Sequence, residues 1–328
     1  MPGDFRVYTS LDETAGRFGP SAISIGNFDG VHAGHQRLLR KVVEIGREHG
    51  WKPSVMTFDP HPARVVAPER APRLLSAPAE RAEWMRSAGI EQVLILPFSH
   101  PFSQLSAEQF VAEVLTARLG ARAIVVGENF RFGRDHLGDT RLLVSLGERY
   151  GYRAEVVSGL RMRGRLVSSS EVRRMIEAGR VSLAARMLGR VYTLNGVVVP
   201  GRGIGSRQTV PTLNLAPAAE VLPAGGVYVT RTREPGGARS WPSVTNVGRR
   251  PTFGGGDLTI ETFLLAPLDG ETPERISVGF LHRLRAERKF ESPEALRAQV
   301  LRETERARAW HRRARALNRN PATDILNV

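Results

Sequence analysis

The sequence predicts a two-domain α/β chain: a doubly wound parallel sheet, followed by a β-barrel domain with a terminal helix. Three observations support this fold class. The 328 residues exceed one ordinary domain. Strand-like and helix-like segments alternate over about the first 190 residues, as in a parallel α/β sheet. Only β-like runs between Gly- and Pro-rich turns follow, up to a last helical segment. We place the domain boundary between residues 186 and 187.

In the first part, short apolar runs predict strands that are covered on both faces of the sheet. These runs are Ala22–Ile25, Pro53–Phe58, Gln92–Pro97, Ala123–Val126 and Arg153–Val157. Helical periodicity occupies the segments between them, namely His35–Glu48, Ala79–Ala88, Ala107–Leu119 and Arg141–Tyr150. Ligands of such sheets bind at the carboxyl ends of the strands, so the loops there are the candidate site.

In the second part, short strands at regular spacing predict a closed or partly closed barrel. The predicted strands are Tyr192–Val199, Val227–Arg231, Ser243–Val247, Leu258–Leu265 and Ile276–Leu281. The last helix begins at Ser292, a good N-cap, with Pro293 in the first helical position. Its predicted apolar stripe is Leu296, Val300, Ala307, Trp310, Ala314 and Leu317.

Composition excludes several classes of function. The chain has no cysteine, which excludes disulfides, thiolate zinc sites and cysteine nucleophiles. The N-terminus lacks the apolar core of a signal peptide and no apolar run approaches membrane-spanning length, so we expect a cytoplasmic protein. The net charge of +14 is compatible with nucleic acid, an anionic membrane or polyanionic small substrates. Many arginines cluster between Arg283 and Arg319, where a solvated helix face is the favoured interpretation.

The most informative stretch runs from Gly26 to His35 and reads GNFDGVHAGH. A strand, a glycine-rich loop and a helix start with two histidines form a place for phosphate. The first N–H groups of a helix lack intrahelical partners, and the helix dipole adds positive potential there. Imidazoles can donate to phosphoryl oxygens as negative charge develops. A capping loop with surface histidines is the alternative for so short a motif.

Three further stretches of the first part have a structural and a functional interpretation each. Thr57–Pro62 is a proline-stiffened turn that contains His61. In Gly127–Gly133, aromatic residues alternate with Arg131 and can either stack a planar ring or pack half-buried. The serines of Val167–Arg173 are ordinary N-caps, yet their hydroxyls and amides can also hold an anion.

The second part offers fewer signals. Gly201–Gly205 is no dinucleotide-binding motif, because Pro211 and a β-like stretch follow where a helix should begin. Pro211–Asn214 alone reads as a turn. Glu261 alternates with the inward Ile260 and, without context, is an exposed strand residue.

Taken in order, these stretches resemble the motifs of the bacterial bifunctional riboflavin kinase/FAD synthetase family over roughly residues 20 to 305. The resemblance implies a nucleotidyltransferase-like first domain in which the phosphate of FMN attacks the α-phosphorus of ATP. His32 and His35 would face the departing pyrophosphate. The implied ATP and phosphate contacts are Gly26, Asn27, Phe28, Asp29, Ser169, Ser170 and Arg173. The implied flavin and nucleotide pocket contains His61, Asn129, Phe130 and Phe132.

For the second domain the resemblance implies a riboflavin kinase. Its nucleotide loop would contain Gly203, Gly205 and Arg207. Thr212 and Asn214 would bind the Mg²⁺ carried by ATP, since hard cations prefer such oxygen ligands. Glu261 would accept the proton of the riboflavin 5′-hydroxyl. The chain departs from the family's loop pattern at Ser206, Thr209 and Val210.

We therefore expect a bifunctional enzyme of flavin-cofactor biosynthesis with riboflavin, FMN and ATP as substrates and with Mg²⁺. One alternative is a monofunctional FMN adenylyltransferase with a degenerate kinase domain. The other is a basic protein with a secondary role in nucleic-acid binding, which would weaken steeply with salt.

Overall fold

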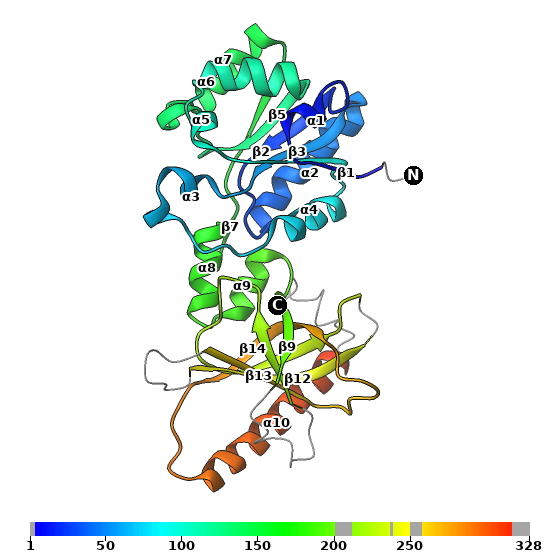
Figure 1. The fold of residues 1–328 in the computed structure, drawn as a ribbon, viewed down its shortest axis with the longest axis vertical. Helices are drawn as coiled ribbons and strands as arrows, with labels where there is room; N and C mark the ends of the chain where they lie inside the picture. The colour runs from blue at the N-terminus through cyan, green and yellow to red at the C-terminus, as the bar shows by residue number, and fades with distance from the viewer. Residues whose placement is uncertain (1–3, 201–211, 237–238, 250–257, 317–328) are drawn as a thin grey trace. The chain divides into compact units, whose positions relative to one another are not determined.

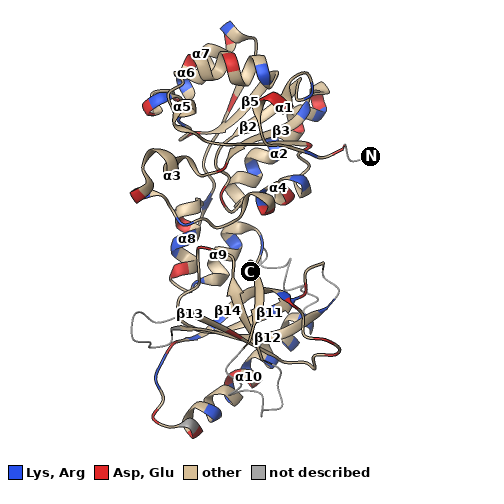
Figure 2. Cartoon of the chain, viewed as in Figure 1, with Lys and Arg blue, Asp and Glu red and all other residues tan. Residues whose placement is uncertain are grey.

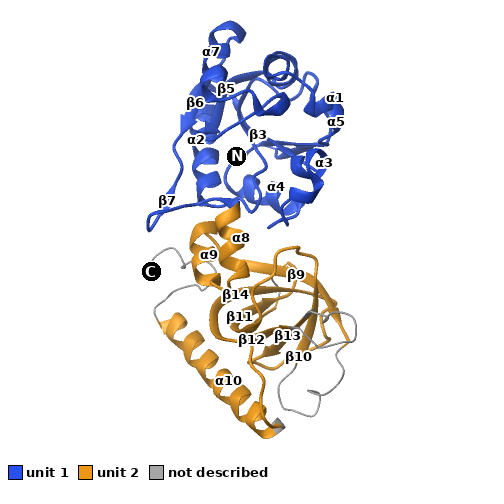
Figure 3. Cartoon of the chain, turned by 90° about the vertical axis from the view of Figure 1, so that its left-hand side faces the viewer, with its two compact units in different colours: residues 1–169 blue, residues 170–328 orange. Residues whose placement is uncertain are grey.

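The computed structural model describes residues 4–200, 212–236, 239–249 and 258–316. The chain divides into two compact units, residues 1–169 and residues 170–328 (Figure 3). The functional boundary that we expect after residue 186 stays a prediction. The predicted nucleotide-loop residues Gly203, Gly205 and Arg207 lie outside the described residues.

The first unit contains a sheet of six parallel strands in the order β1-β4-β3-β2-β5-β6 (Figure 1). The strands are β1 (Arg6–Tyr8), β2 (Ser21–Ile25), β3 (Lys52–Phe58), β4 (Gln92–Leu96), β5 (Ala121–Gly127) and β6 (Arg153–Val157). All five predicted strands are confirmed, with shifts of one or two residues at some ends. The edge strand β1 was not predicted, because three residues are too few for a periodic signal.

Helices occupy the segments between the strands, as predicted. They are α1 (Leu11–Thr14), α2 (Ala33–His49), α3 (Pro62–Val66), α4 (Pro78–Ser87), α5 (His100–Ser103), α6 (Ala107–Gln109) and α7 (Thr140–Tyr150), with short 3-10 turns η1 (Pro68–Arg70) and η3 (Arg134–His136). The helix predicted over Ala107–Leu119 exists, but after α6 it continues as the π-helix η2 (Phe110–Arg118). A hairpin of β7 (Arg161–Met162) and β8 (Arg165–Leu166) follows the sheet.

The inner strands β2, β3, β4 and β5 are mostly buried, and successive side chains along each strand point to opposite faces of the sheet. In β5, Ile124 and Val126 belong to the apolar cluster that also contains side chains of η2 and α7. Ala123 and Val125 belong to the opposite cluster, which contains side chains of α2 and α4. The two clusters are therefore the cores of the two faces, and the predicted doubly wound architecture is confirmed.

The strand order places the candidate site. The chain proceeds from β2 through β3 to β4 on one side and returns to β5 and β6 on the other side. The loops after β2 and β5 thus leave the sheet in opposite directions, which is the switch point where ligands of α/β sheets bind. The predicted site stretches Gly26–His35 and Gly127–Gly133 are these two loops.

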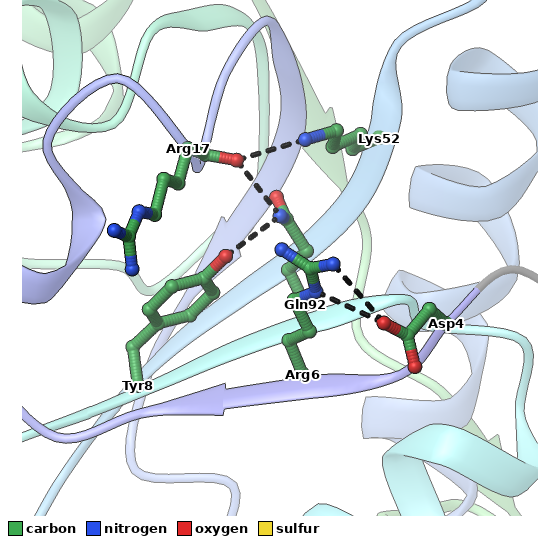
Figure 4. Close-up of polar contacts among 6 residues, drawn as sticks. All are labelled: Asp4, Arg6, Tyr8, Arg17, Lys52 and Gln92. Carbon is green, nitrogen blue, oxygen red and sulfur yellow. Dashed lines mark hydrogen bonds and ion pairs between the residues drawn. The ribbon is translucent and has the colours of Figure 1, made fainter.

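The opposite, amino-terminal edge of the sheet is closed by a polar cluster (Figure 4). Gln92 at the start of β4 is buried and donates to the Tyr8 hydroxyl and to the Arg17 carbonyl, both at 3.3 Å. Lys52 at the start of β3 donates to the same carbonyl at 2.8 Å. These bonds satisfy buried polar groups away from the candidate site, so their role is structural.

The second unit is a closed barrel of six antiparallel strands in the order β10-β13-β12-β11-β14-β9. The strands are β9 (Tyr192–Val199), β10 (Thr212–Pro217), β11 (Gly226–Arg233), β12 (Ser240–Arg249), β13 (Leu258–Leu264) and β14 (Arg275–Ala286). The helices α8 (Ser169–Glu177) and α9 (Val181–Leu188) precede the barrel. The predicted barrel is confirmed, but the turn predicted at Pro211–Asn214 is wrong for Thr212–Asn214, because these residues pair with β9 and β13.

The last helix, α10 (Pro293–Ala316), begins as predicted, with the Ser292 hydroxyl accepting from the amide of Ala295 at 3.2 Å. Ala307 and Trp310 pack with Val227, Val229 and Val244 on the outer face of the barrel. The predicted stripe fails at its beginning, where Leu296 is 44% exposed. The described arginines of α10 are solvated, as favoured for this charge run: Arg297, Arg302, Arg306, Arg308, Arg312, Arg313 and Arg315 (Figure 2). None of the helices in the described ranges has the length and apolar character needed to cross a membrane.

Candidate functional site

Two histidines mark the start of α2, directly after the β2 loop. His32 is buried and caps the helix: its Nδ1 accepts from the amide of His35 at 3.3 Å. A neutral His32 therefore carries its proton on Nε2, which makes Nε2 a donor. The His32 and His35 rings stack with centroids 3.6 Å apart. The predicted pair is thus brought together at a helix N-terminus, where donors and dipole favour an anion.

Gly34 makes room for this arrangement. A Cβ at residue 34 would lie 3.1 Å from both Cε1 and Nδ1 of His32 and 3.4 Å from the Val167 carbonyl. Contacts of 3.1 Å are tighter than ordinary van der Waals distance, so a side chain here would displace the imidazole. The glycine between the histidines is therefore explained by packing.

The loop itself is strongly curved. Phe28, Gly30 and Val31 all have positive φ angles, of 48°, 74° and 34°. Such angles are strained for a phenylalanine and especially for a β-branched valine, and backbone strain of this kind is typical of functional loops. Phe28 places its ring in the core beside α2, at 2% exposure. Its side chain therefore anchors the loop in the core.

Asp29 has a similar anchoring side chain. It is 2% exposed and accepts from the amide of Leu75 at 2.9 and 3.1 Å and from the Ser76 hydroxyl at 3.3 Å. Its backbone carbonyl accepts from the Ser169 hydroxyl at 2.9 Å. Sequence reasoning grouped Asp29 and Ser169 among the phosphate contacts. In the structure both side-chain groups hold protein segments against the β2 loop.

The β3 loop lies beside the β2 loop. Gly26 extends the pairing of β2 with β3, since its amide donates to the Met56 carbonyl at 3.1 Å. The side-chain amide of Asn27 lies 3.0 Å from Nε2 of His61, which caps α3. Thr57 donates from its hydroxyl to the Asn27 carbonyl at 3.1 Å. Asn27 and His61, predicted from separate motifs, are therefore direct neighbours.

The β5 loop adds an aromatic surface. Phe132 is buried, Phe130 is half-buried and stacks on it with centroids 5.5 Å apart, and Asn129 is exposed. Tilted and edge-on ring contacts extend this aromatic cluster to residues that sequence reasoning missed, because they come from β3, η2 and the segment around α5. Their ring contacts are Phe132–Phe110, Phe110–Phe102, Phe102–Phe58 and Phe58–Phe98, with centroids 5.4–6.1 Å apart. Of the predicted pair, Phe130 is the one with a partly accessible ring.

A second missed residue is Arg81 of α4. Its side chain is 2% exposed and its guanidinium donates to the Asn27 carbonyl at 2.6 Å. Burial lowers the pKa of Arg81, while the nearby carboxylates of Asp29 and Asp59 oppose that shift. A single arginine in a helix of mixed polar and apolar residues forms no recognisable motif, so the sequence does not indicate its position in the site.

Ser170 and Arg173 lie on α8 in the second unit, where the Arg173 guanidinium is 3.4 Å from the Ser170 hydroxyl. Their predicted contact with ATP phosphates stays a prediction.

The barrel carries a separate polar row. Asn214 of β10 pairs with Glu261 of β13, and Glu261 pairs with Asn246 of β12. Residues paired across neighbouring strands point to the same face. Their neighbours Leu213, Thr262 and Thr245 are buried in the barrel, so the row lies on the outer face. The predicted metal ligand and the predicted base are thus adjacent.

Thr212 lies two residues from Asn214 on the same strand and face. Its hydroxyl oxygen is buried and has no hydrogen-bond partner among the residues that the structure describes. A buried hydroxyl needs a partner, and hydroxyl and amide oxygens are ligands that suit Mg²⁺. Clusters of three or more His, Asp or Glu side chains that could hold a metal are absent from the described residues. The predicted ligands Thr212 and Asn214 are neutral, so phosphate oxygens and water would complete the coordination of a metal held by them.

Comparisons with known proteins agree with the two-part organisation. A family model described as FAD synthetase matches residues 16–171, and one described as riboflavin kinase matches residues 188–311. A bifunctional riboflavin kinase/FMN adenylyltransferase of Pseudomonas fluorescens is 36% identical over 287 residues, 87% of this chain and 91% of the relative. One from Escherichia coli strain K12 is 33% identical over 288 residues, 88% of this chain and 92% of the relative.

The fold also has a counterpart among solved structures. A crystal structure described as a macrolide-efflux protein from Streptococcus pneumoniae aligns with a TM-score of 0.82 at 27% identity. The alignment covers 93% of this chain and 99% of that chain. The whole two-unit architecture is therefore shared with a known structure.

Proposed function

We propose that this chain, which belongs to the family of bifunctional riboflavin kinase/FMN adenylyltransferases, divides its two activities between its two units. The parallel-sheet unit would transfer AMP from ATP to FMN, giving FAD and pyrophosphate. The barrel unit would transfer a phosphoryl group from ATP to riboflavin, giving FMN. The observation that carries the assignment is the assembly of His32, His35, Asn27, His61 and Phe130 at the switch point of the sheet.

In the sheet unit, the reacting bond lies between the α-phosphorus of ATP and the oxygen that leaves with pyrophosphate. Nε2 of His32 and the first amides of α2 would donate to phosphate oxygens as charge builds on the leaving group. Such a transfer relies on positioning and charge neutralisation, so it needs no covalent intermediate. The buried position of His32 strengthens these interactions because water is excluded.

The aromatic surface supports a planar ligand. The ring of Phe130 stacks on Phe132, and Phe132 in turn contacts Phe110 in a cluster of phenylalanines. A rigid aromatic face offers stacking without much loss of side-chain freedom. We assign it to a flavin or adenine ring, with the exposed Asn129 at its edge.

In the barrel unit, Glu261 would accept the proton of the riboflavin 5′-hydroxyl as phosphoryl transfer proceeds. Thr212 and Asn214 would hold the Mg²⁺ of MgATP, for which the buried Thr212 hydroxyl provides a fitting ligand. Bound Mg²⁺ neutralises phosphate charge. The pairing of Asn214 with Glu261 supports this proposal because it places the proposed base next to a proposed ligand of the Mg²⁺ that ATP carries.

The test uses both activities of one protein. Purified His32→Ala and Glu261→Gln are incubated with riboflavin, ATP and Mg²⁺, and then with FMN, ATP and Mg²⁺, and the flavins are separated by chromatography. We expect His32→Ala to lose about 100-fold or more in FAD formation, as for loss of a transition-state donor, with FMN formation within about 2-fold. We expect the reverse for Glu261→Gln, with a loss of about 100-fold, as for loss of a general base.

Matched controls come from the same elements or their neighbours. His49→Ala removes an exposed histidine at the end of α2, and Glu274→Gln changes an exposed carboxylate just before β14. Both should leave both activities within about 2-fold. A His32→Ala enzyme with normal FAD formation, or a Glu261→Gln enzyme with normal FMN formation, would remove that residue from the mechanism.

The cytoplasmic location expected from the sequence stays a prediction.

A further inference from the structure

Arg81 is a buried cation that contacts the backbone of the β2 and β3 loops. Its Nη1 donates to the Asn27 carbonyl at 2.6 Å and to the Thr57 hydroxyl at 3.3 Å. Its Nη2 reaches the Phe58 carbonyl at 3.4 Å. The guanidinium therefore joins the carboxyl ends of the two central strands, at the edge of the sheet where the candidate site lies.

The segment that leads to Arg81 holds the β2 loop at two further points. The amide of Leu75 donates to the Asp29 carboxylate at 2.9 Å, and the Ser76 hydroxyl accepts from the amide of Gly30 at 2.9 Å. We call residues 75–81 the bracket. It binds the loop at Asn27, Asp29 and Gly30, so hydrogen bonds from residues 75–81 stabilise the curved conformation of the loop.

The bond to Asn27 also orients a donor. The Asn27 carbonyl and the Phe28 N–H belong to one planar trans peptide and point in opposite directions. With the carbonyl held toward Arg81, the Phe28 N–H points away from Arg81. Within the described part of the chain, this N–H has no hydrogen-bond partner. A buried N–H without a partner is costly, and an anionic oxygen would satisfy it.

The charge of Arg81 contributes as well. The guanidinium is buried, it donates to carbonyl and hydroxyl oxygens, and its Nε has no partner among the described residues. Burying this cation is costly, and the nearby carboxylates of Asp29 and Asp59 offset only part of that cost, since the pKa of Arg81 is still lowered. A triphosphate on the other side of the Asn27–Phe28 peptide would experience the field of this charge with little screening by water.

We propose that Arg81 is a positioning residue for adenylyl transfer: it orients the Asn27–Phe28 peptide so that the Phe28 N–H donates to a phosphate oxygen of ATP. The proposal rests on the function proposed above for the sheet unit. Arg81 contacts no substrate itself. It acts through the peptide and through its buried charge, in concert with the bracket.

The test compares Arg81→Met with Arg81→Lys. Methionine preserves much of the volume but removes charge and donors, whereas lysine keeps the charge and can still reach one carbonyl. We expect Arg81→Met to lower kcat of FMN adenylylation about 30- to 100-fold, with the KM for FMN within about 3-fold. Arg81→Lys should recover at least a third of the lost activity on a logarithmic scale. The reverse reaction, ATP formation from FAD and pyrophosphate, should fall by the same factor.

Two internal controls separate positioning from folding. Riboflavin phosphorylation by the barrel unit of the same protein should stay within about 2-fold. Arg86→Met changes an arginine on the same helix that is exposed and paired with Glu83, and it should affect neither activity. A defect that is merely structural would lower both variants of Arg81 alike and would not be recovered by lysine.

If Arg81→Met fails to fold, Thr57→Val tests the same contact, because the Thr57 hydroxyl also donates to the Asn27 carbonyl. We expect a loss of about 3- to 10-fold in kcat of adenylylation for this milder change. Normal adenylylation in Arg81→Lys and Thr57→Val together, or in folded Arg81→Met, overturns the proposal. Failure of the proposed function has a different signature, because His32→Ala would then also adenylylate normally.

Discussion

His311 makes the stability of the barrel unit depend on pH. Its side chain lies between α10 and the barrel at 4% exposure, and its Nε2 lies 3.1 Å from the Thr230 carbonyl. Its Nδ1 is buried without a partner among the described residues. Burial, with a smaller effect of Arg231, lowers the pKa of His311 to about 4. The native state therefore holds this ring neutral, with the proton on Nε2.

The sign follows from the two pKa values. The unfolded chain has an ordinary histidine pKa near 6.5. Above pH 6.5 neither state binds the proton, so stability does not depend on His311. Between pH 6.5 and about 4 only the unfolded state binds it, and stability falls by about 1.4 kcal/mol for each pH unit. From pH 7.5 to pH 5 the loss amounts to about 2 kcal/mol, a large part of the stability of an ordinary domain.

The assay isolates this one group. His311→Gln keeps an amide donor near the position of Nε2 but cannot titrate, so its difference from the wild type cancels all other ionisations. Trp241 and Trp310 report on the barrel unit once Trp51 and Trp84 are replaced by phenylalanine in both proteins. Urea unfolding at several pH values then gives the two free energies of unfolding. When the pH is lowered from 7.5 to 5, the free energy of unfolding of the variant should rise by about 2 kcal/mol relative to that of the wild type.

A constant difference between the two proteins over this pH range would refute the reasoning. It would mean that the His311 side chain is protonated as easily in the native state as in the unfolded chain. The packing of α10 on the barrel would then not exclude water from the ring, contrary to its 4% exposure.

Two further predictions concern the two sites. Gly34→Ala should lower kcat of adenylylation about 10-fold through displacement of the His32 ring, with riboflavin phosphorylation unchanged in the same preparation as the control. Equal adenylylation rates in the variant and the wild type would show that His32 tolerates the shift. Thr212→Val should raise the Mg²⁺ concentration for half-maximal riboflavin phosphorylation about 10-fold without changing that of adenylylation. An unaltered Mg²⁺ titration of the kinase reaction would remove Thr212 from the metal site.

Much of the fold follows from the sequence because its signals are local. Fully apolar runs such as Ile124–Val126 predict buried strands, and the periodicity of residues 35–48 predicts α2. The strand β10 was missed because Thr212 and Asn214 alternate with only two leucines next to a proline, which resembles a turn. Its state is decided by pairing with β9 and β13, which no local pattern encodes.

The candidate site was predictable where one motif contains both the chemistry and its neighbours in sequence. His32 and His35 meet because they are three residues apart at a helix start. The neighbouring positions of Asn27 and His61 depend on contacts between segments far apart in the chain, and so does the aromatic cluster that joins Phe58 to Phe130. The same holds for Arg81, whose importance lies in a carbonyl fifty-four residues away.

The β2 loop shows that residues of one motif have two different physical tasks. Phe28, Asp29 and Gly34 direct their side chains, or the lack of one, into the protein, and they determine the shape of the loop. His32 and the amides of residues 28 and 33 are the groups that can donate to phosphate. A change of the first kind should therefore alter both the stability of the sheet unit and adenylylation. A change of the second kind should lower adenylylation by more than it lowers stability, and His32→Ala also removes the side-chain cap of α2.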